Sequence, residues 1–176
     1  MFDFTRNHFE LFGLPARFRL DAAALERAYR ELQRDVHPDR YAGAADHEKR
    51  LALQGSARVN EAYRTLKDPV ARAEYLLQLS GIDATAETDT RMRADFLMRQ
   101  LERREGADDA RAGHDESALA AILADVQRES GQLLADLESV LDGDDREAAR
   151  MRVRELRFLA KLGDDLRDMQ LAELDR

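Results

Sequence analysis

The sequence has no cysteine, no tryptophan and only three prolines among its 176 residues. The absence of cysteine excludes disulfide bonds, thiolate metal ligands and cysteine nucleophiles. It also fits a reducing compartment, and we expect the protein to be cytoplasmic. No apolar run approaches the ~20 residues of a membrane-spanning helix. The first 15 residues carry acids and lack the apolar segment of a secretory signal, so we expect neither export nor a membrane association.

A basic surplus is also lacking, because the formal net charge is −8. Binding to phosphate backbones depends on clustered Lys and Arg, so this charge argues against a nucleic-acid partner. The charge is uneven, at +1 for residues 1–80 and −9 for residues 81–176. This difference predicts two parts with different electrostatic roles. The scarcity of proline and the 36% charged residues favour an all-α fold.

Motifs for catalysis or metal binding are absent as well. The histidines form no HExxH motif and no pair at i,i+4, so no metal site is expected. A nucleotide-binding glycine loop is lacking, and no Ser or Cys nucleophile with an oxyanion-hole motif accompanies His37 and Asp39. The acids at 142–145 lack the spacing of a calcium loop. We therefore expect no enzyme activity and no cofactor.

Helix signals are strong in residues 1–80. Asp21 is a good N-cap for a helix that ends at Val36, and the pair Asp68-Pro69 starts another that runs to Leu79. A short helix over 8–12 precedes them, and a long helix over about 46–66 lies between. The apolar stripe expected for that long helix comprises Leu51, Leu53, Ala57, Val59, Ala62, Tyr63 and Leu66.

The rest of the chain predicts a second domain. Residues 81–89 are small, polar and acidic, as is typical of a linker. Helices are expected over about 90–104, from Asp115 or Ser117 to about 141, and from about 146 to 174, with a loop over 105–114. Asp144 and Glu147 resemble a capping box for the last helix. These helices cannot hide their apolar faces alone, so a three-helix bundle over 90–176 is predicted.

The most informative motif is His37-Pro38-Asp39. Proline removes a backbone donor, fixes its own φ and pushes the residue before it out of helical geometry. The helix that starts at Asp21 must therefore stop here. His37 and Asp39 should sit on a rigid turn between two antiparallel helices.

Several segments together resemble a known family. They are FELFGLPARF at 9–18, LQRDVHPDR at 32–40, VNEAYRTLKDPVARAEYLL at 59–77, FLMRQLE at 96–102 and ELRFLAKL at 155–162. The tripeptide alone is a weak signal, but with the third segment it is typical of a J-domain. The first and fourth segments make the chain similar to the HscB family, the J-proteins of bacterial iron–sulfur cluster assembly.

The resemblance implies a J-domain over residues 1–80 and a C-terminal three-helix bundle over 90–176, in an L-shaped arrangement. The J-domain would stimulate the ATPase of a DnaK-family chaperone, HscA, through its tripeptide turn. Four arginines would form a positive face for an acidic patch on that chaperone. The implied chaperone-binding residues are His37, Pro38, Asp39, Arg27, Arg30, Arg34 and Arg40.

The bundle would bind the cluster scaffold protein, IscU, and deliver it to the chaperone. The residues to which the resemblance assigns this contact are Leu97, Met98, Leu101, Glu102, Glu105 and Phe158. The first five recur at three- and four-residue steps, so their spacing places them on one helical face. An apolar patch rimmed by acids is a common form of partner site.

Two other interpretations stay open. A general J-domain co-chaperone for DnaK would share the turn, although the Gly/Phe-rich or zinc regions common in such proteins are absent. Alternatively, the chain is a purely structural helical bundle in which the tripeptide is coincidental. Loss of chaperone stimulation on substitution of His37 separates the last interpretation from the others.

Overall fold

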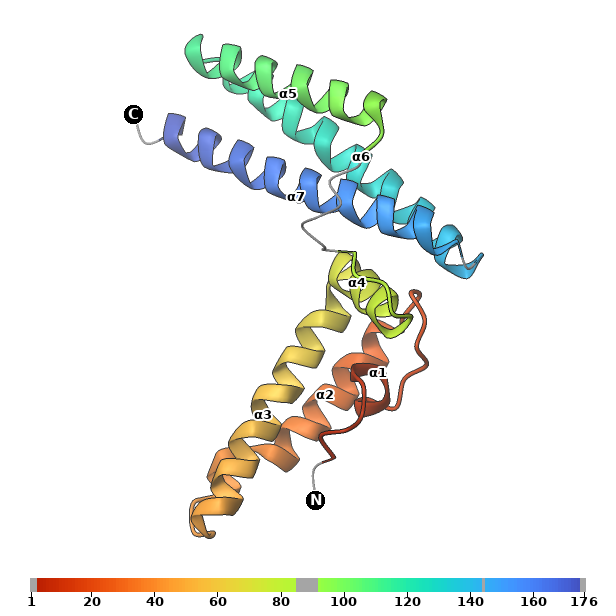
Figure 1. Ribbon diagram of the computed structural model, residues 1–176. Helices are drawn as coiled ribbons and strands as arrows, with labels where there is room; N and C mark the ends of the chain where they lie inside the picture. The colour runs from red at the N-terminus through yellow and green to blue at the C-terminus, as the bar shows by residue number, and fades with distance from the viewer. Residues whose placement is uncertain (1–2, 85–91, 144, 175–176) are drawn as a thin grey trace. The chain divides into compact units, whose positions relative to one another are not determined.

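The computed structural model describes residues 3–84, 92–143 and 145–174, and every regular element in these ranges is helical. The chain divides into two compact units, Met1–Leu76 and Leu77–Arg176 (Figure 1). Each unit has its own apolar core. The all-α fold, with an N-terminal helical hairpin and a C-terminal helical bundle, is confirmed.

The first unit is built on two long helices that lie side by side, α2 (Ala22–Val36) and α3 (Asp46–Lys67). Between them runs a short 3₁₀ helix, η1 (Pro38–Tyr41), and α1 (His8–Leu11) packs against α3. Apolar side chains from α1, α2 and α3 meet in one core. Its buried members are Phe9, Leu11, Phe12, Leu25, Val36, Val59, Ala62 and Leu66.

Local sequence signals explain where these helices begin and end. The Asp21 carboxylate accepts the N–H groups of Ala23 and Ala24, at 2.9 and 3.0 Å, and so caps α2. The Asp68 carboxylate accepts the N–H of Ala71 at 2.8 Å, which caps α4 (Pro69–Leu79). The predicted starts of both helices are confirmed. The boundary between the two units falls within α4.

The second unit consists mainly of three helices, α5 (Ala94–Ala112), α6 (Glu116–Asp142) and α7 (Arg146–Leu174). Helices α6 and α7 form a long antiparallel pair, and α5 packs on both (Figure 1). The core of this pair consists of aliphatic side chains at helical spacing. It includes Leu119, Val126, Leu133, Leu137, Val153, Leu156, Leu159 and Leu166.

The prediction of a loop over 105–114 is wrong for most of that range, because α5 continues to Ala112. The two glycines suggested a break. Gly106 instead lies where α5 approaches α6, and a Cβ atom there would be 3.4 Å from the Cδ1 atom of Ile122. Ala107 and Ala110 are buried in the same interface. Small residues here let the two helices come close, so they mark packing and not a loop.

The predicted apolar stripe of α3 is also partly wrong. Leu51 and Leu53 are 38% and 62% exposed, while the smaller Ala52 and Gly55 are buried. Asp115 caps α6 as expected, through the N–H of Ala118 at 2.9 Å. The predicted capping residue Asp144 lies outside the described residues.

Candidate functional site

The turn at residues 37–39 follows directly from the end of α2. His37 leaves helical geometry, with φ −63° and ψ 127°, and Pro38 starts η1. The backbone N–H of Asp39 donates to Nδ1 of His37 at 3.3 Å. The imidazole ring therefore caps η1 and holds a defined position. The rigid turn that the sequence predicts is present.

Two side chains after the turn tie it back to α2. Arg40 donates from Nη1 to the carbonyl of Arg34 and to the carboxylate of Asp35, both at 3.0 Å. The hydroxyl of Tyr41 donates to the carbonyl of Asp35 at 3.1 Å. These bonds satisfy carbonyls at the end of α2 that have no partner within the helix. Arg40, predicted as a docking cation, thus also holds the turn, and Tyr41 is a supporting residue that the sequence reasoning missed.

The turn offers one donor and one acceptor to a partner. The side chains of His37 and Asp39 are 53% and 90% exposed. Since Nδ1 of His37 accepts a hydrogen bond, the neutral ring carries its proton on Nε2 and can donate from there. The Asp39 carboxylate can accept a charge-assisted hydrogen bond from an arginine of a partner.

The basic residues of α2 lie beside the turn along one exposed face. Arg30 pairs with Glu26 at 3.1 Å, and the hydroxyl of Tyr63 also donates to that carboxylate. The bonds from Tyr63 and then Arg30 lower the pKa of Glu26 below its ordinary value. Arg27 and Arg34 are exposed and make no ion pair among the described residues. They are therefore more available to a partner than Arg30.

A second exposed feature lies on α5, and we call it the α5 patch. It consists of the five exposed residues Leu97, Met98, Leu101, Glu102 and Glu105. The three apolar side chains are 44%, 58% and 52% exposed, so they form no part of the bundle core. The structure thus brings together five of the six residues predicted for this site.

The sixth residue, Phe158, comes from α7 and is half-buried. Its ring packs edge-on against Phe96, with 5.9 Å between the centroids and 81° between the planes. Phe96 is fully buried and belongs to the inner face of α5. Phe158 therefore supports α5 from beneath.

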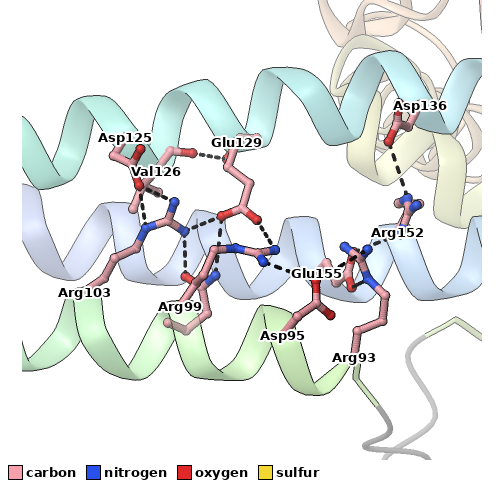
Figure 2. A network of polar contacts seen from close by, with 12 residues as sticks. Arg93, Asp95, Arg99, Arg103, Asp125, Val126, Glu129, Asp136, Arg152 and Glu155 are labelled. Carbon is pink, nitrogen blue, oxygen red and sulfur yellow. Dashed lines mark hydrogen bonds and ion pairs between the residues drawn. The ribbon is translucent and has the colours of Figure 1, made fainter.

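The inner face of α5 carries a polar network that the sequence reasoning missed (Figure 2). At the start of the helix, the guanidinium of Arg93 donates two hydrogen bonds, of 2.8 and 3.2 Å, to the carboxylate of Glu155 of α7. Ten residues further on, Arg103 bonds to Asp125 and Glu129 of α6. Glu155 is completely buried, so the hydrogen bonds from its arginine partners replace those that it would make to water.

The middle of this network is centred on Glu129. Its carboxylate accepts from Arg99 at 2.9 Å, from the amide of Gln100 at 3.4 Å, and from Arg103. Burial opposes ionisation of Glu129, but the arginine bonds outweigh it and hold the pKa of this carboxyl below its ordinary value. The bond from Arg103 likewise lowers the pKa of Asp125. Both acids are therefore charged at neutral pH.

The described residues contain no cluster of three or more side chains that could hold a metal ion. Within the same ranges no helix is long and apolar enough to cross a membrane.

Comparison with known proteins assigns both units. Residues 7–75 match the DnaJ domain, and residues 92–167 match a family described as the HSCB C-terminal oligomerisation domain. The first match and the exposed turn define a J-domain co-chaperone, a class of protein that regulates a partner ATPase. The two matches together show that the chain belongs to the HscB family.

Individual relatives agree with this assignment. The co-chaperone protein HscB homolog of Burkholderia vietnamiensis is 48% identical over 160 residues, which cover 91% of each chain. That of Paraburkholderia phytofirmans is 46% identical over 169 residues, 96% of each chain. Among solved structures, chaperone HscB from Vibrio cholerae has a TM-score of 0.84 and 39% identity, covering 96% of this chain and 99% of its own. Human co-chaperone HscB has a TM-score of 0.87 and 32% identity, covering 94% of this chain and 82% of its own.

Proposed function

We propose that this protein stimulates the ATPase of the chaperone HscA and delivers the iron–sulfur scaffold protein IscU to it. The observation that carries the proposal is the exposed His-Pro-Asp turn on a J-domain that is joined to an HscB-type C-terminal domain. In this role the protein aids the maturation of iron–sulfur proteins, and we place it in the cytoplasm. The two domains are proposed as residues 1–80 and 90–176, joined by a linker over 81–89.

The first step is docking on the chaperone. Arg27 and Arg34 make no ion pair among the described residues, and their positive charge on the helix that leads to the turn would steer an acidic surface toward it. Asp39 would then accept a charge-assisted hydrogen bond from an arginine of the chaperone, while His37 donates from Nε2. Pro38 keeps both groups in place. Arg30 and Arg40 would contribute charge from their paired positions.

The second step is delivery of the scaffold. Three exposed apolar side chains of the α5 patch would pack on an apolar surface of IscU, and Glu102 and Glu105 would face basic groups at its rim. Phe158 would support this contact from beneath α5. Such a patch is unusual on a helix that already packs in a bundle, which supports its use as a partner surface.

A second candidate function is that of a general J-domain co-chaperone for DnaK. The turn and the basic face of α2 favour it, because both would serve any DnaK-family chaperone. The α5 patch favours the scaffold-specific role. The two proposals differ in whether stimulation depends on IscU.

The turn is tested by the steady-state ATPase of the host's HscA, with and without IscU. The native chain should stimulate the ATPase, and His37→Gln should lose at least about nine-tenths of that stimulation, a tenfold change. His47→Gln is a matched control, because His47 is an exposed histidine of α3 that is not part of the turn. Equal stimulation by His37→Gln and the native chain would contradict the proposal.

The patch is tested by binding of IscU to a variant with Leu97, Met98 and Leu101 changed to Ala. The affinity should fall at least about tenfold while the stimulation that is independent of IscU persists. Leu171→Ala is the control, since Leu171 is 59% exposed on α7. Stimulation of DnaK with no effect of IscU would favour the general co-chaperone.

A further inference from the structure

Helix α5 packs with an unusual orientation, because its most apolar face is turned to solvent. Leu97, Met98 and Leu101 are each at least 44% exposed. The buried positions of the same helix are Phe96, Gln100, Ala107 and Ala110. Between Phe96 and Ala107, the middle of the inner face is polar.

The hydrophobic effect alone would not hold the middle of α5 in this orientation. A rotation by about one residue, 100°, would bring Leu97 and Leu101 toward α6 and α7 in place of Gln100. Phe96 anchors only the first turn, and the close approach to α6 at Gly106, Ala107 and Ala110 fixes only the last turns. Another interaction must therefore set the orientation of the middle turns.

The polar cluster beneath the patch supplies that interaction. We define the polar cluster as Gln100 and Arg103 of α5 with Glu129 of α6. Gln100 is 4% exposed, and the side chains of Arg103 and Glu129 are 10% and 12% exposed. Arg103 also bonds to Gln100 at 3.0 Å, so each of the three groups contacts the other two.

The hydrogen bonds of a buried polar cluster require particular directions between donor and acceptor, whereas apolar packing does not. If α5 rotated, Glu129 would lose its bonds from Arg103 and Gln100 while it remained largely buried, and an unpaired buried charge is costly. The low pKa of Glu129 fits a carboxylate that is stabilised as an anion in this position. The cluster thus penalises the very rotation that would bury the patch.

We propose that Gln100, Arg103 and Glu129 are positioning residues for scaffold binding, which hold α5 so that its apolar face stays exposed. This proposal rests on the proposed function only for the identity of the partner. The orientation of α5 itself can be measured without any partner.

The test replaces all three residues of the polar cluster by alanine, as Gln100→Ala, Arg103→Ala and Glu129→Ala. The groups left behind keep other partners, because Asp125 still pairs with Arg128 and Arg99 still pairs with Asp95. The space that alanine leaves at these positions favours rotation of α5, because Leu97 and Leu101 can fill it. If the three residues only stabilised the bundle, the variant would either fold with the α5 patch exposed as before or fail to fold.

The chain has no cysteine, so a single Leu101→Cys substitution gives a unique reporter of exposure. Leu101 is 52% exposed, and its replacement thiol should react readily with a small maleimide in the otherwise native chain. In the alanine-substituted cluster, the reaction should slow at least about tenfold, which corresponds to about 1.4 kcal/mol. Helicity by circular dichroism should be unchanged.

Binding of IscU is then measured in both backgrounds without the cysteine. The cluster variant should bind at least about tenfold more weakly than the native chain. The control is Asp136→Leu, which removes an acid of α6 that pairs with Arg152 and not with α5. This control should change neither thiol reactivity nor scaffold binding.

Unchanged thiol reactivity in a folded cluster variant would overturn the proposal. A protected thiol together with unchanged IscU affinity would have two consequences. It would support the role of the cluster in orienting α5, and it would contradict the proposed scaffold site. If the triple variant fails to fold, Glu129→Gln replaces it, since this change keeps the side-chain volume and one acceptor oxygen. A smaller fall in thiol reactivity would support the proposal there, and no fall would overturn it.

Discussion

The two candidate sites of this protein are held in place by different kinds of interaction. The His-Pro-Asp turn is fixed by groups within six residues of one another, including Pro38 and the bonds from Arg40 and Tyr41 to α2. The α5 patch is fixed by pairs 22 to 62 residues apart, such as Arg103 with Asp125 and Arg93 with Glu155. A local site survives wherever its own segment folds. A site built from distant pairs depends on the whole bundle.

The two sites also differ in where the residues that hold the surface lie relative to the residues that form it. In the turn, the presented groups and the holding groups are neighbours in sequence. At the second site, the presented side chains and the residues Gln100 and Arg103 of the polar cluster lie on opposite faces of α5, and Glu129 comes from α6. A substitution can therefore abolish the second site without touching any residue that contacts a partner.

The largest effect is expected from Phe96→Ala. Loss of this fully buried ring should destabilise the second unit by about 3–5 kcal/mol. All four tyrosines lie in the first unit, at positions 29, 41, 63 and 75, so tyrosine fluorescence during urea unfolding reports that unit. Circular dichroism should show an early transition while the fluorescence transition stays in place.

Phe9→Ala is the matched control for this experiment. Phe9 is equally buried, but in the first unit, where its ring lies 6.1 Å from that of Tyr75. This change should shift the fluorescence transition instead. Equal shifts of both signals in both variants would mean that the units do not unfold separately, and would break the comparison.

A smaller loss is expected from Glu155→Ala. The carboxylate is fully buried, but its partners Arg93 and Arg152 have side chains 39% and 22% exposed, so water can solvate them after the change. We expect a loss of about 1–3 kcal/mol in the stability of the second unit by urea unfolding. Glu147→Ala removes an exposed carboxylate of the same helix that pairs with the half-buried Arg150, and the loss should stay within about 0.5 kcal/mol. Similar losses of stability in both variants would show that the buried carboxylate contributes no more than the exposed one.

The two units should also differ in their response to acid. Burial lowers the pKa of His8 below its ordinary value of 6.5, Arg58 adds to this effect, and Glu61 opposes it. The unfolded first unit therefore binds more protons, and its stability should fall as the pH drops below about 6.5. Tyrosine-detected melting between pH 7.5 and 5 measures this, and His8→Phe should flatten the profile.

The acids of the second unit respond at lower pH. The folded pKa of Glu129 lies below its ordinary value of 4.5, so its contribution is complete above that pH and is lost as the pH falls through the folded pKa. The second unit should therefore keep its stability between pH 7.5 and 5. A loss there as large as that of the first unit would contradict the assignment.

The smallest effects are expected at two helical glycines. Gly131→Ala in α6 places a methyl group in open space and should stabilise the helix by up to about 1 kcal/mol. Gly106→Ala brings the same gain in propensity, but its Cβ atom would lie 3.4 Å from Ile122. Its net gain should be smaller. Thermal melts by circular dichroism compare the two, and a larger gain at Gly106 would mean that α5 is loosely packed on α6.

Sequence reasoning succeeded where the determining interactions are local. Asp21, Asp68 and Pro38 set helix starts and the turn through groups within a few residues, so their effect could be predicted. It failed at Gly106 and Leu53, because both depend on the position of a neighbouring helix. That position decides whether a glycine breaks a helix or allows a close approach, and whether a leucine is buried or exposed. The polar cluster was missed for the same reason. One signal was available, since Gln100 and Arg103 fall on the helical stripe that contains Phe96 and Ala107.

The turn described above has a consequence for the entropy of binding. Its backbone is already ordered by Pro38, by the capping imidazole of His37 and by the bond from Arg40, so a chaperone that binds it orders little beyond two side chains. The loss of conformational freedom occurs when the chain folds and not when the complex forms. A contact of this kind gains specificity from few atoms and needs no large interface. It can therefore form and dissolve repeatedly, as a partner that cycles between nucleotide states requires.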